Sequence, residues 1–290
     1  MSQPDVSNLP TVEAEMAYSV ASDGVARIRV FPPSSGREVE TPAREKRTVS
    51  VFDCRPLVDE LKMDVAGFEL HSDTTGFADY YSPEQVRQHY YPEVVALLTK
   101  KLDAQAVFVF DHNVRSRVRS ARKEVGVREP VEGAHNDYTL ASGPKRIEDI
   151  LRENNAHHLL ANRAALINVW RPIVGPVQDH PLAICDARST TLKDFIATEI
   201  QHFQEDDLET PAHVGEVFSF KHNPAHRWYY ASEMQPDEVI FLKCFDTALD
   251  GRARYTGHTG FQNPDCPADF VARESIEART VVVFPELRPA

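Results

Sequence analysis

The sequence predicts a mainly β protein with flanking helices, whose core is a double-stranded β-helix (a jelly-roll, cupin-like fold). The main observation is a succession of short apolar, β-branched runs, separated by turn sequences, from 165 to 284. The second is a pair of helical patterns, at 82–102 and 144–154, that lie before most of these runs. Helices in the first half followed by many short strands are typical of a β-sandwich or barrel with helices packed outside.

The helix expected at 82–102 has the clearest local signals in the chain. Ser82 can serve as its N-cap, Pro83 occupies the first helical position, and Gln85 completes a capping box. Pro92 falls inside the run, and a proline there removes one backbone hydrogen bond. We therefore expect either a kinked helix or two consecutive helices.

Three further segments are interpreted from their patterns. The run at 104–112 is typical of a buried strand, whereas 190–203 has the spacing of a helix. The segment 114–133 is dense in charge and lacks an apolar face. We expect it to be a long exposed loop, and it is a candidate lid over a binding site.

Composition limits the kinds of partner. The chain has 44 acidic and 32 basic residues, a net charge of −12, which argues against nucleic acid or an anionic membrane as partner. No run reaches the roughly 18 apolar residues of a membrane helix, and the N-terminus lacks the features of a signal peptide. The four cysteines lie far apart without a CxxC pair. Reduced thiols and a cytoplasmic location are therefore expected.

The sequence His135-Asn136-Asp137 is the first candidate for chemistry. On a strand, residues i and i+2 point to the same side, so this imidazole and this carboxylate would converge on one point. A histidine from a distant strand would complete a two-histidine, one-carboxylate facial triad. Such a triad leaves one face of iron(II) open for a bidentate co-substrate and oxygen.

Among the twelve histidines, His258 is favoured as the third ligand by two residues downstream of it. Arg273 and Ser275 lie at the start of the apolar run IEARTVVVF, and they share one strand face. A buried guanidinium grips a carboxylate with two charge-assisted hydrogen bonds, and a serine hydroxyl adds another. This pair suits the distal carboxylate of 2-oxoglutarate.

The ordered set of His135, Asp137, His258, Arg273 and Ser275 resembles the Fe(II)/2-oxoglutarate oxygenase superfamily. The segments AHNDYT, INVWRPI, FLKCFDT, YTGHTGFQNP and ARESIEARTVVVF look more narrowly like its gibberellin-desaturase-like, cephalosporin 7α-methoxylase-component-like group of hydroxylases and desaturases. The resemblance spans about residues 50 to 286. It implies Fe(II), 2-oxoglutarate and O2 as cofactor and co-substrates. It also implies hydroxylation, desaturation or cyclisation of a small molecule of secondary metabolism, with release of succinate and CO2.

The resemblance also shapes the expected domain organisation. The interval from His135 to His258 is longer than is usual in the superfamily, so His213 and His226 stay open as alternative third ligands. The long interval implies an insertion at about 144–215. We expect a single domain over 1–290, comprising a loose tail (1–15), N-terminal strands and helices (16–130) and a jelly-roll core (131–286) that carries the insertion.

Four more residues are candidates for the site. Asn168 could donate a hydrogen bond to the co-substrate, and Trp170 shares its strand face while Arg171 takes the other. Tyr138, beside the metal pair, together with Trp170 and Arg171 could contact the primary substrate. The alternative for INVWRP is a core tryptophan with a salt-bridged arginine.

Two other functions fit parts of the pattern. A non-catalytic jelly-roll that binds a small molecule would need Arg273 but no iron. A metal-dependent hydrolase could use His135 and Asp137, but the sequence has neither HExxH nor a second carboxylate-rich cluster near them. The oxygenase remains the main prediction.

Overall fold

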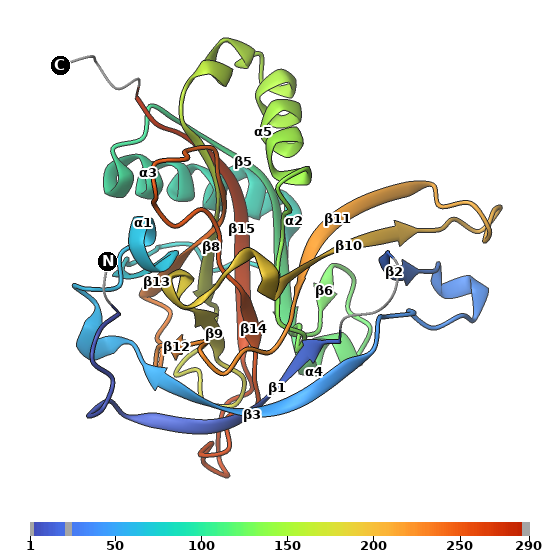
Figure 1. The fold of residues 1–290 in the computed structure, drawn as a ribbon. Helices are drawn as coiled ribbons and strands as arrows, with labels where there is room; N and C mark the ends of the chain where they lie inside the picture. The colour runs from blue at the N-terminus through green and yellow to red at the C-terminus, as the bar shows by residue number, and fades with distance from the viewer. Residues whose placement is uncertain (1–2, 21–24, 286–290) are drawn as a thin grey trace.

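Two curled β-sheets form the body of the protein in the computed structural model, which describes residues 3–20 and 25–285 (Figure 1). The nine-stranded sheet has the order β1-β3-β12-β9-β14-β7-β11-β10-β2, and the six-stranded sheet has the order β4-β13-β8-β15-β5-β6. Most neighbouring strands are antiparallel; β2–β10, β3–β12 and β5–β6 are parallel. This arrangement is the expected jelly-roll.

The strands of both sheets come from all parts of the chain. The nine-stranded sheet contains β1 (Thr11–Ser19), β2 (Ala26–Val30), β3 (Arg44–Asp53), β7 (His135–Asn136), β9 (Leu182–Cys185), β10 (Phe195–His202), β11 (His213–Phe220), β12 (Trp228–Tyr230) and β14 (His258–Gly260). The six-stranded sheet contains β4 (Phe68–Ser72), β5 (Ala106–Ser116), β6 (Val127–Arg128), β8 (Ala164–Pro172), β13 (Glu238–Asp246) and β15 (Glu274–Val283). The α-helices are α1 (Met63–Ala66), α2 (Pro83–Gln85), α3 (Tyr91–Leu102), α4 (Arg117–Ala121) and α5 (Ser142–Glu153).

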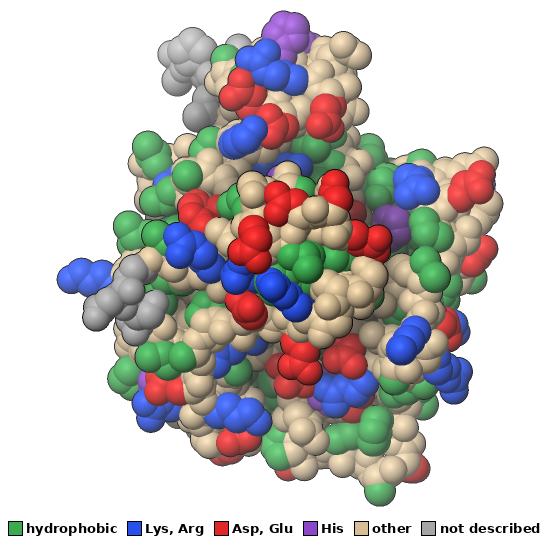
Figure 2. Space-filling model, turned by 90° about the vertical axis from the view of Figure 1, so that its right-hand side faces the viewer, with side chains coloured by type: hydrophobic (Ala, Val, Ile, Leu, Met, Phe, Trp, Pro, Cys, Tyr) green, Lys and Arg blue, Asp and Glu red, His purple; other side chains and the backbone are tan. Residues whose placement is uncertain are grey.

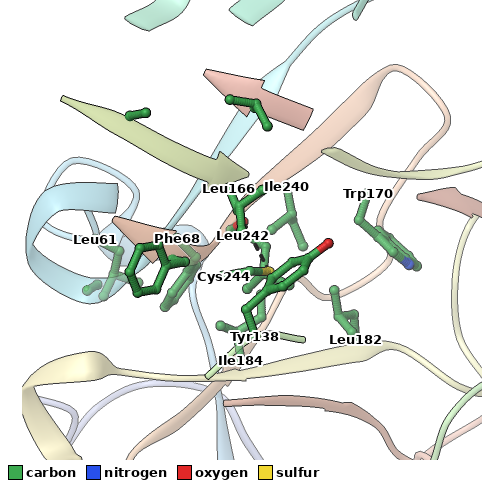
Figure 3. Packing of buried hydrophobic residues seen from close by; sticks show 14 of the residues in the cluster. Leu61, Phe68, Tyr138, Leu166, Trp170, Leu182, Ile184, Ile240, Leu242 and Cys244 are labelled. Atoms are coloured by element: carbon green, nitrogen blue, oxygen red, sulfur yellow. Dashed lines mark hydrogen bonds between the residues drawn. The ribbon is translucent and has the colours of Figure 1, made fainter. Parts of the chain in front are cut away.

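The core lies on both faces of the six-stranded sheet. All nine residues of β8 are buried, and alternate ones face opposite layers. Leu166 and Trp170 join the cluster between the two sheets, where Tyr138 and Leu182 pack (Figure 3). Ala165, Ile167 and Val169 face the other way, against the apolar side of α3. A strand covered on both faces needs a continuous apolar run, which explains the sequence AALINVW.

The helix expected at 82–102 is confirmed. Its first residues form α2, a π-helical turn covers Val86–Tyr90, and α3 continues to Leu102. The Ser82 side chain accepts a hydrogen bond from the backbone N–H of Gln85, as expected of the N-cap. Pro92 lies in the first turn of α3, directly after the π-helical turn, where its missing N–H costs least.

The prediction of a helix at 190–203 is wrong. Phe195–His202 is the strand β10, paired antiparallel with β11 and parallel with β2. Its β-branched residues, such as Thr198 and Ile200, are well suited to a pleated strand. The helical spacing of the apolar residues did not reveal these long-range pairings, which decide the conformation.

The expected boundaries need three corrections. Within the tail 1–15, residues from Thr11 onward belong to β1 and pair with β3, because a neighbouring strand satisfies their backbone. The proposed insertion at 144–215 contains β8 and β9, which are integral strands of the two sheets. Residues 1–2 of the tail and residue 286 of the core lie outside the described residues.

The third correction concerns 114–133, which is not one exposed loop. Strand β5 continues through Ser116, and this buried serine pairs in register with Glu274 of β15. Arg119 in α4 then forms an ion pair with Glu274 at 3.2 Å. Ladder pairing and this ion pair hold the first part of the segment, although Val125 is 97% exposed.

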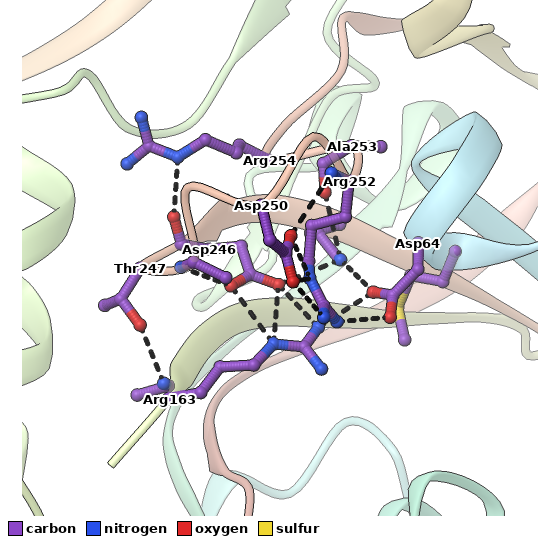
Figure 4. A network of polar contacts seen from close by, with 12 residues as sticks. Asp64, Arg163, Asp246, Thr247, Asp250, Arg252, Ala253 and Arg254 are labelled. Atoms are coloured by element: carbon purple, nitrogen blue, oxygen red, sulfur yellow. Dashed lines mark hydrogen bonds and ion pairs between the residues drawn. The ribbon is translucent and has the colours of Figure 1, made fainter. Parts of the chain in front are cut away.

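A buried network of charges joins α1 to β8 and β13 (Figure 4). Lys243 is fully buried and donates to Asp64 at 2.5 Å and to Asp246 at 2.9 Å. Arg163 pairs with the same two carboxylates at 2.8 and 2.7 Å. Each buried charge therefore has a partner of opposite sign, as burial requires.

Candidate metal centre

Three potential metal ligands meet between the two sheets. His135 is the first residue of β7, Asp137 comes directly after that strand, and His258 is the first residue of β14. Strands β7 and β14 pair antiparallel, with His135 directly opposite His258. One ligand atom from each of the three side chains lies within 4.8 Å of the others. The i, i+2 spacing and this cross-strand pair together bring the predicted ligands to one point.

The two imidazoles offer the same nitrogen to the cluster. The Nε2 atoms of His135 and His258 lie 3.5 and 4.0 Å from Oδ1 of Asp137. Nδ1 of His135 lies 2.7 Å from the carbonyl oxygen of Gly133, so it carries the proton and donates it there. That hydrogen bond leaves Nε2 of His135 with a free lone pair facing the carboxylate.

The carboxylate of Asp137 is held at one oxygen only. Asn168 donates to Oδ2 at 2.9 Å, and Nη2 of Arg279 lies 3.4 Å from the same oxygen. Oδ1 is the oxygen that faces the two histidines. Donors on one oxygen and imidazoles on the other orient the group for one-oxygen coordination of a cation.

Electrostatics keep this donor set ready for a cation. Burial acts to raise the pKa of Asp137, but the charge of Arg279 and the nearby histidines hold it well below its usual range. Burial, with a contribution from His135, lowers the pKa of His258 to about 3. At neutral pH the carboxylate is therefore ionised and His258 is neutral. Two imidazoles and one carboxylate are the donor set of a non-haem iron(II) site.

Arg273 is a buried cation beside this cluster without an acidic partner. Its side chain is 4% exposed, and no carboxylate in residues 3–20 and 25–285 forms a salt bridge with it. Its guanidinium donates to the carbonyl of His180 at 2.7 Å and to Oγ of Ser275 at 3.2 Å, and it lies 5.0 Å from the ring centroid of Trp170. Burial lowers the pKa of Arg273 to about 9, so the group is still charged at neutral pH. A buried unpaired guanidinium suits an anionic ligand.

Two hollows meet at the cluster. A small one is lined by His135, His258, Trp170 and Arg273. A cavity of about 810 Å³ opens on the other side, against β10, β11 and α5, and includes His135, Asp137 and Tyr138 in its wall. His135 and Arg279 line both hollows. Residues of the metal cluster therefore lie in the walls of both a small hollow, which contains Arg273, and a much larger cavity.

Most of the other predicted residues reach the site, but with different contacts. Asn168 donates to the Asp137 carboxylate and is not among the residues that line the small hollow, so its contact with the co-substrate stays a prediction. Tyr138 is only 8% exposed and packs in the core, with part of its surface toward the large cavity (Figure 3). Trp170 offers its ring to the guanidinium of Arg273 and so helps to hold that group in place.

Arg171 is not brought to the site. It lies on the opposite face of β8, is 1% exposed, and donates to the carbonyls of Asp73 and Pro236 at 2.6 and 2.8 Å. It also pairs with the Asp73 carboxylate. The expected contact between Arg171 and substrate is corrected, since strand alternation turns the side chain away.

The alternative third ligands are also placed elsewhere. His226 stacks on Phe220 and lies 3.4 Å from Asp194. His213 faces His202 across β10 and β11, in the wall of the large cavity. Neither belongs to the ligand cluster.

Arg279 was missed by the sequence reasoning. It lies on β15 two residues after Glu277, with which it forms an ion pair at 3.3 Å. Its positive charge also compensates the negative charge of Asp137, at 3.4 Å. The available signal was alternation, because Arg273, Ser275, Glu277 and Arg279 repeat every second residue along one face of the final strand.

Comparison with known proteins defines the class. The model of the family described as "Oxidoreductase/YMDC permease-like domain" matches residues 16–283. The chain is 30% identical over 293 residues to the hydroxylase/desaturase efuI of Hormonema carpetanum, covering 96% of each chain. It is 31% identical over 259 residues to the hydroxylase/desaturase CTB9 of Cercospora beticola, covering 83% of this chain and 78% of that protein.

A solved structure agrees with both. The iron and alpha-ketoglutarate-dependent endoperoxidase NvfI superposes with a TM-score of 0.80 at 26% identity, over 97% of this chain and 100% of that one. Fold, site and relatives together define an Fe(II)/2-oxoglutarate-dependent dioxygenase, which uses Fe(II), 2-oxoglutarate and O2. The chain belongs to the oxidoreductase family whose model it matches, among enzymes named hydroxylase/desaturase. None of the helices within the described residues is long and apolar enough to cross a membrane.

Proposed function

We propose that His135, Asp137 and His258 bind the iron of this dioxygenase, and that Arg273 with Ser275 binds the distal carboxylate of 2-oxoglutarate. The observation that carries the proposal is the buried Arg273 guanidinium, which lacks an acidic partner within the described residues and lines the same hollow as His135 and His258. An anionic co-substrate would neutralise this cation. Iron(II) with 2-oxoglutarate and oxygen supplies the oxidising power of the reaction.

The protein's own contribution is orientation. Asn168 and Arg279 hold Oδ2 of Asp137, so that Oδ1 is presented to the cation together with two Nε2 atoms. His135, Asp137 and His258 would hold the metal, and the two hollows beside them would receive the co-substrate and the substrate. No general acid or base is needed at the substrate.

The burial of the site protects the reaction. His258 is 3% exposed, and Leu182 and Trp170 are among the residues that line the hollow that contains Arg273. Burial of the Arg273 guanidinium away from bulk water would strengthen its attraction for the co-substrate carboxylate.

We propose a small molecule of secondary metabolism as the primary substrate, which the large cavity would receive. The cavity of about 810 Å³ is large enough for a polycyclic scaffold. Relatives named for a hydroxylase/desaturase and for an endoperoxidase support a hydrogen-abstracting oxidation of such a compound. Hydroxylation, desaturation or cyclisation would depend on which carbon the cavity presents to the metal.

We further propose a cytoplasmic protein that acts without nucleic acid or membrane. All four cysteines are free, which supports a reducing compartment. Acidic and basic side chains are interspersed on the face shown in Figure 2, without a continuous basic surface there. That mixed surface, with the net charge of −12, supports a small-molecule partner.

Substrate-independent turnover of 2-oxoglutarate tests the site. With iron(II) and oxygen, the wild type should release labelled CO2 from 2-oxoglutarate carboxyl-labelled at carbon 1, and His135→Ala, Asp137→Ala and His258→Ala should not. Arg273→Ala should raise the KM for 2-oxoglutarate about a hundredfold, because a buried charge-assisted pair is lost. His89→Ala, an exposed histidine on the π-helical turn, is the control. Full activity in the Asp137 variant would contradict the assignment.

A further inference from the structure

The large cavity beside the metal cluster has an uneven distribution of charge. Its acidic groups are already engaged: Asp149 pairs with Lys145 at 3.0 Å, and Glu199 with Arg27 at 3.1 Å. Glu216 accepts from the Thr139 hydroxyl, and Asp137 is held by Arg279. The acids in the cavity wall are therefore occupied by donors from the protein itself.

Three arginines in the same wall, Arg44, Arg128 and Arg146, have no such partner within the described residues, and Arg146 instead lies over the ring of Phe110, 5.8 Å from its centroid. Among residues 3–20 and 25–285, neither Arg44 nor Arg128 forms a salt bridge. In contrast, Arg117 and Arg119 of the neighbouring segment pair with Glu132 and Glu124. Arg44 and Arg128 are both exposed, so their guanidinium groups are accessible to a ligand in the cavity.

Arg44 lies close to the metal cluster. Its guanidinium crosses the backbone of Gly133, where an added Cβ would lie 2.8 Å from Cζ. The carbonyl of Gly133 accepts the hydrogen bond from His135 that fixes the ligand's tautomer. Gly133 therefore lies between the guanidinium of Arg44 and the ligand His135. The N–H donors of Arg44 lie in the cavity wall.

Arg128 is a second cation of the cavity wall, and it lies near His202 of β10. Burial, then His213 and Arg128, lower the pKa of His202, so this ring stays neutral near pH 7. His202 and His213 face each other at 6.1 Å between ring centroids. The neutral imidazole of His202 adds a hydrogen-bond donor beside the Arg128 charge without repelling it.

The rest of the wall is largely apolar, with Ile28, Ala134, Ile200, Val214 and Val217 among its residues. We propose that the primary substrate combines an apolar scaffold with an anionic oxygen group, a carboxylate or a phosphate, which Arg44 and Arg128 bind. Guanidinium forks match both groups. This inference rests on the proposed function in one respect: the anion anchors the scaffold so that its carbon skeleton reaches the iron.

Two fluorescent probes with one skeleton test the inference on metal-free protein. 8-Anilinonaphthalene-1-sulfonate has an anionic oxygen group, and N-phenyl-1-naphthylamine lacks it. The wild type should bind the sulfonate more tightly. The double variant Arg44→Ala/Arg128→Ala should weaken sulfonate binding about tenfold, as expected for two charge-assisted contacts near solvent, and change binding of the neutral probe less than about twofold.

The matched control is Arg47→Ala/Arg122→Ala. These arginines lie on the same strand as Arg44 and in the segment before Arg128, outside the cavity wall, and their removal changes the net charge equally. The control should keep the wild-type preference for the sulfonate. Equal sulfonate binding by both double variants, or no preference in the wild type, would overturn the inference.

Competition identifies the anion. Abietic acid, farnesyl phosphate and methyl abietate are compared as displacers of the bound sulfonate probe. Displacement by the acid alone indicates a carboxylate and by the phosphate alone a phosphate; displacement by methyl abietate as strongly as by the acid contradicts anion recognition. Because the probes need no iron, failure of the metal site leaves these results intact, and failure here leaves the metal site intact.

Discussion

At the scale of single residues, the site depends on how Asp137 is held rather than on its presence alone. Asn168 donates to Oδ2 at 2.9 Å, and that contact fixes which oxygen faces the histidines. Asn168→Ala should weaken binding of iron(II), or of its air-stable substitute cobalt(II), about tenfold, as is usual when a ligand's supporting hydrogen bond is lost. Isothermal titration calorimetry measures the change, and Asn154→Ala, remote on the end of α5, serves as control.

Arg279 should control the pH dependence of metal binding. Its charge is the main cause that lowers the pKa of Asp137, against the opposing effect of burial. Only the ionised carboxylate binds a cation, so affinity is present above this pKa and is lost as the pH falls through it. Arg279→Gln raises the pKa, and its cobalt(II) affinity should therefore decline at a higher pH than in the wild type. Arg279→Lys, which keeps the charge, should stay closer to the wild-type profile.

The result that would contradict this role is an identical acid limb for the wild type and Arg279→Gln. It would mean that the two histidines alone keep Asp137 ionised. Circular dichroism at each pH separates loss of metal from loss of fold.

Sequence spacing predicted which residues lie together where local geometry determined it. His135 and Asp137 needed only the two-residue period of a strand, and Arg273 reached Ser275 for the same reason. The contacts of Asn168 and Arg171 could not be predicted in the same way. Which face of β8 points to the site depends on the register between β8 and β15.

At the scale of elements, α5 contains a test of packing against intrinsic propensity. Gly143 lies in its first turn, and alanine there would favour the helix by about 1 kcal/mol. However, an added Cβ would lie 2.5 Å from Cγ of Phe245, which is buried. Overpacking of about 1–3 kcal/mol should outweigh the propensity, so Gly143→Ala should lower the free energy of unfolding.

Urea denaturation measures this change. Gly76→Ala is the control, because no atom lies within 4 Å of its added Cβ. A Gly143→Ala variant as stable as the wild type would show that Phe245 moves aside at little cost.

Element boundaries show where sequence patterns lose their information. The N-cap at Ser82 is a local hydrogen bond, so the start of its helix could be predicted. Strand β10 could not, since its conformation is determined by pairing with β2, far earlier in the chain, as the ion pair between Arg27 and Glu199 illustrates. The beginning of 114–133 was misjudged for the same reason, because β15 supplies its partner.

At the scale of the whole molecule, the charge network of Figure 4 joins α1, in the first quarter of the chain, to β13, in the last quarter. Lys243 is fully buried between Asp64 and Asp246. Lys243→Met should lower the free energy of unfolding by about 3–5 kcal/mol, because it leaves the buried carboxylate of Asp246 with one fewer cation. Thermal or urea unfolding tests this against Lys193→Met, an exposed lysine. A loss below about 1 kcal/mol would mean that Arg163 alone is sufficient.

The molecule as a whole was predictable in class but not in topology. Strand density indicated a jelly-roll, and the ordered ligands indicated an oxygenase. The long interval between His135 and His258 suggested an insertion, whereas β8 and β9 within it are core strands. The number of residues between two ligands does not determine their distance in space, because β7 and β14 are neighbours in one sheet although six strands lie between them in the chain.

The central claim is that one cluster binds iron and the adjacent buried arginine binds the co-substrate. Anaerobic addition of iron(II) and then 2-oxoglutarate to the metal-free protein tests both through the visible charge-transfer band of the ternary complex. We expect the band in the wild type, its absence in His258→Ala, and a requirement for far more 2-oxoglutarate in Arg273→Ala. Tight iron binding by the wild type without the band, or an unchanged band in His258→Ala, would contradict the account.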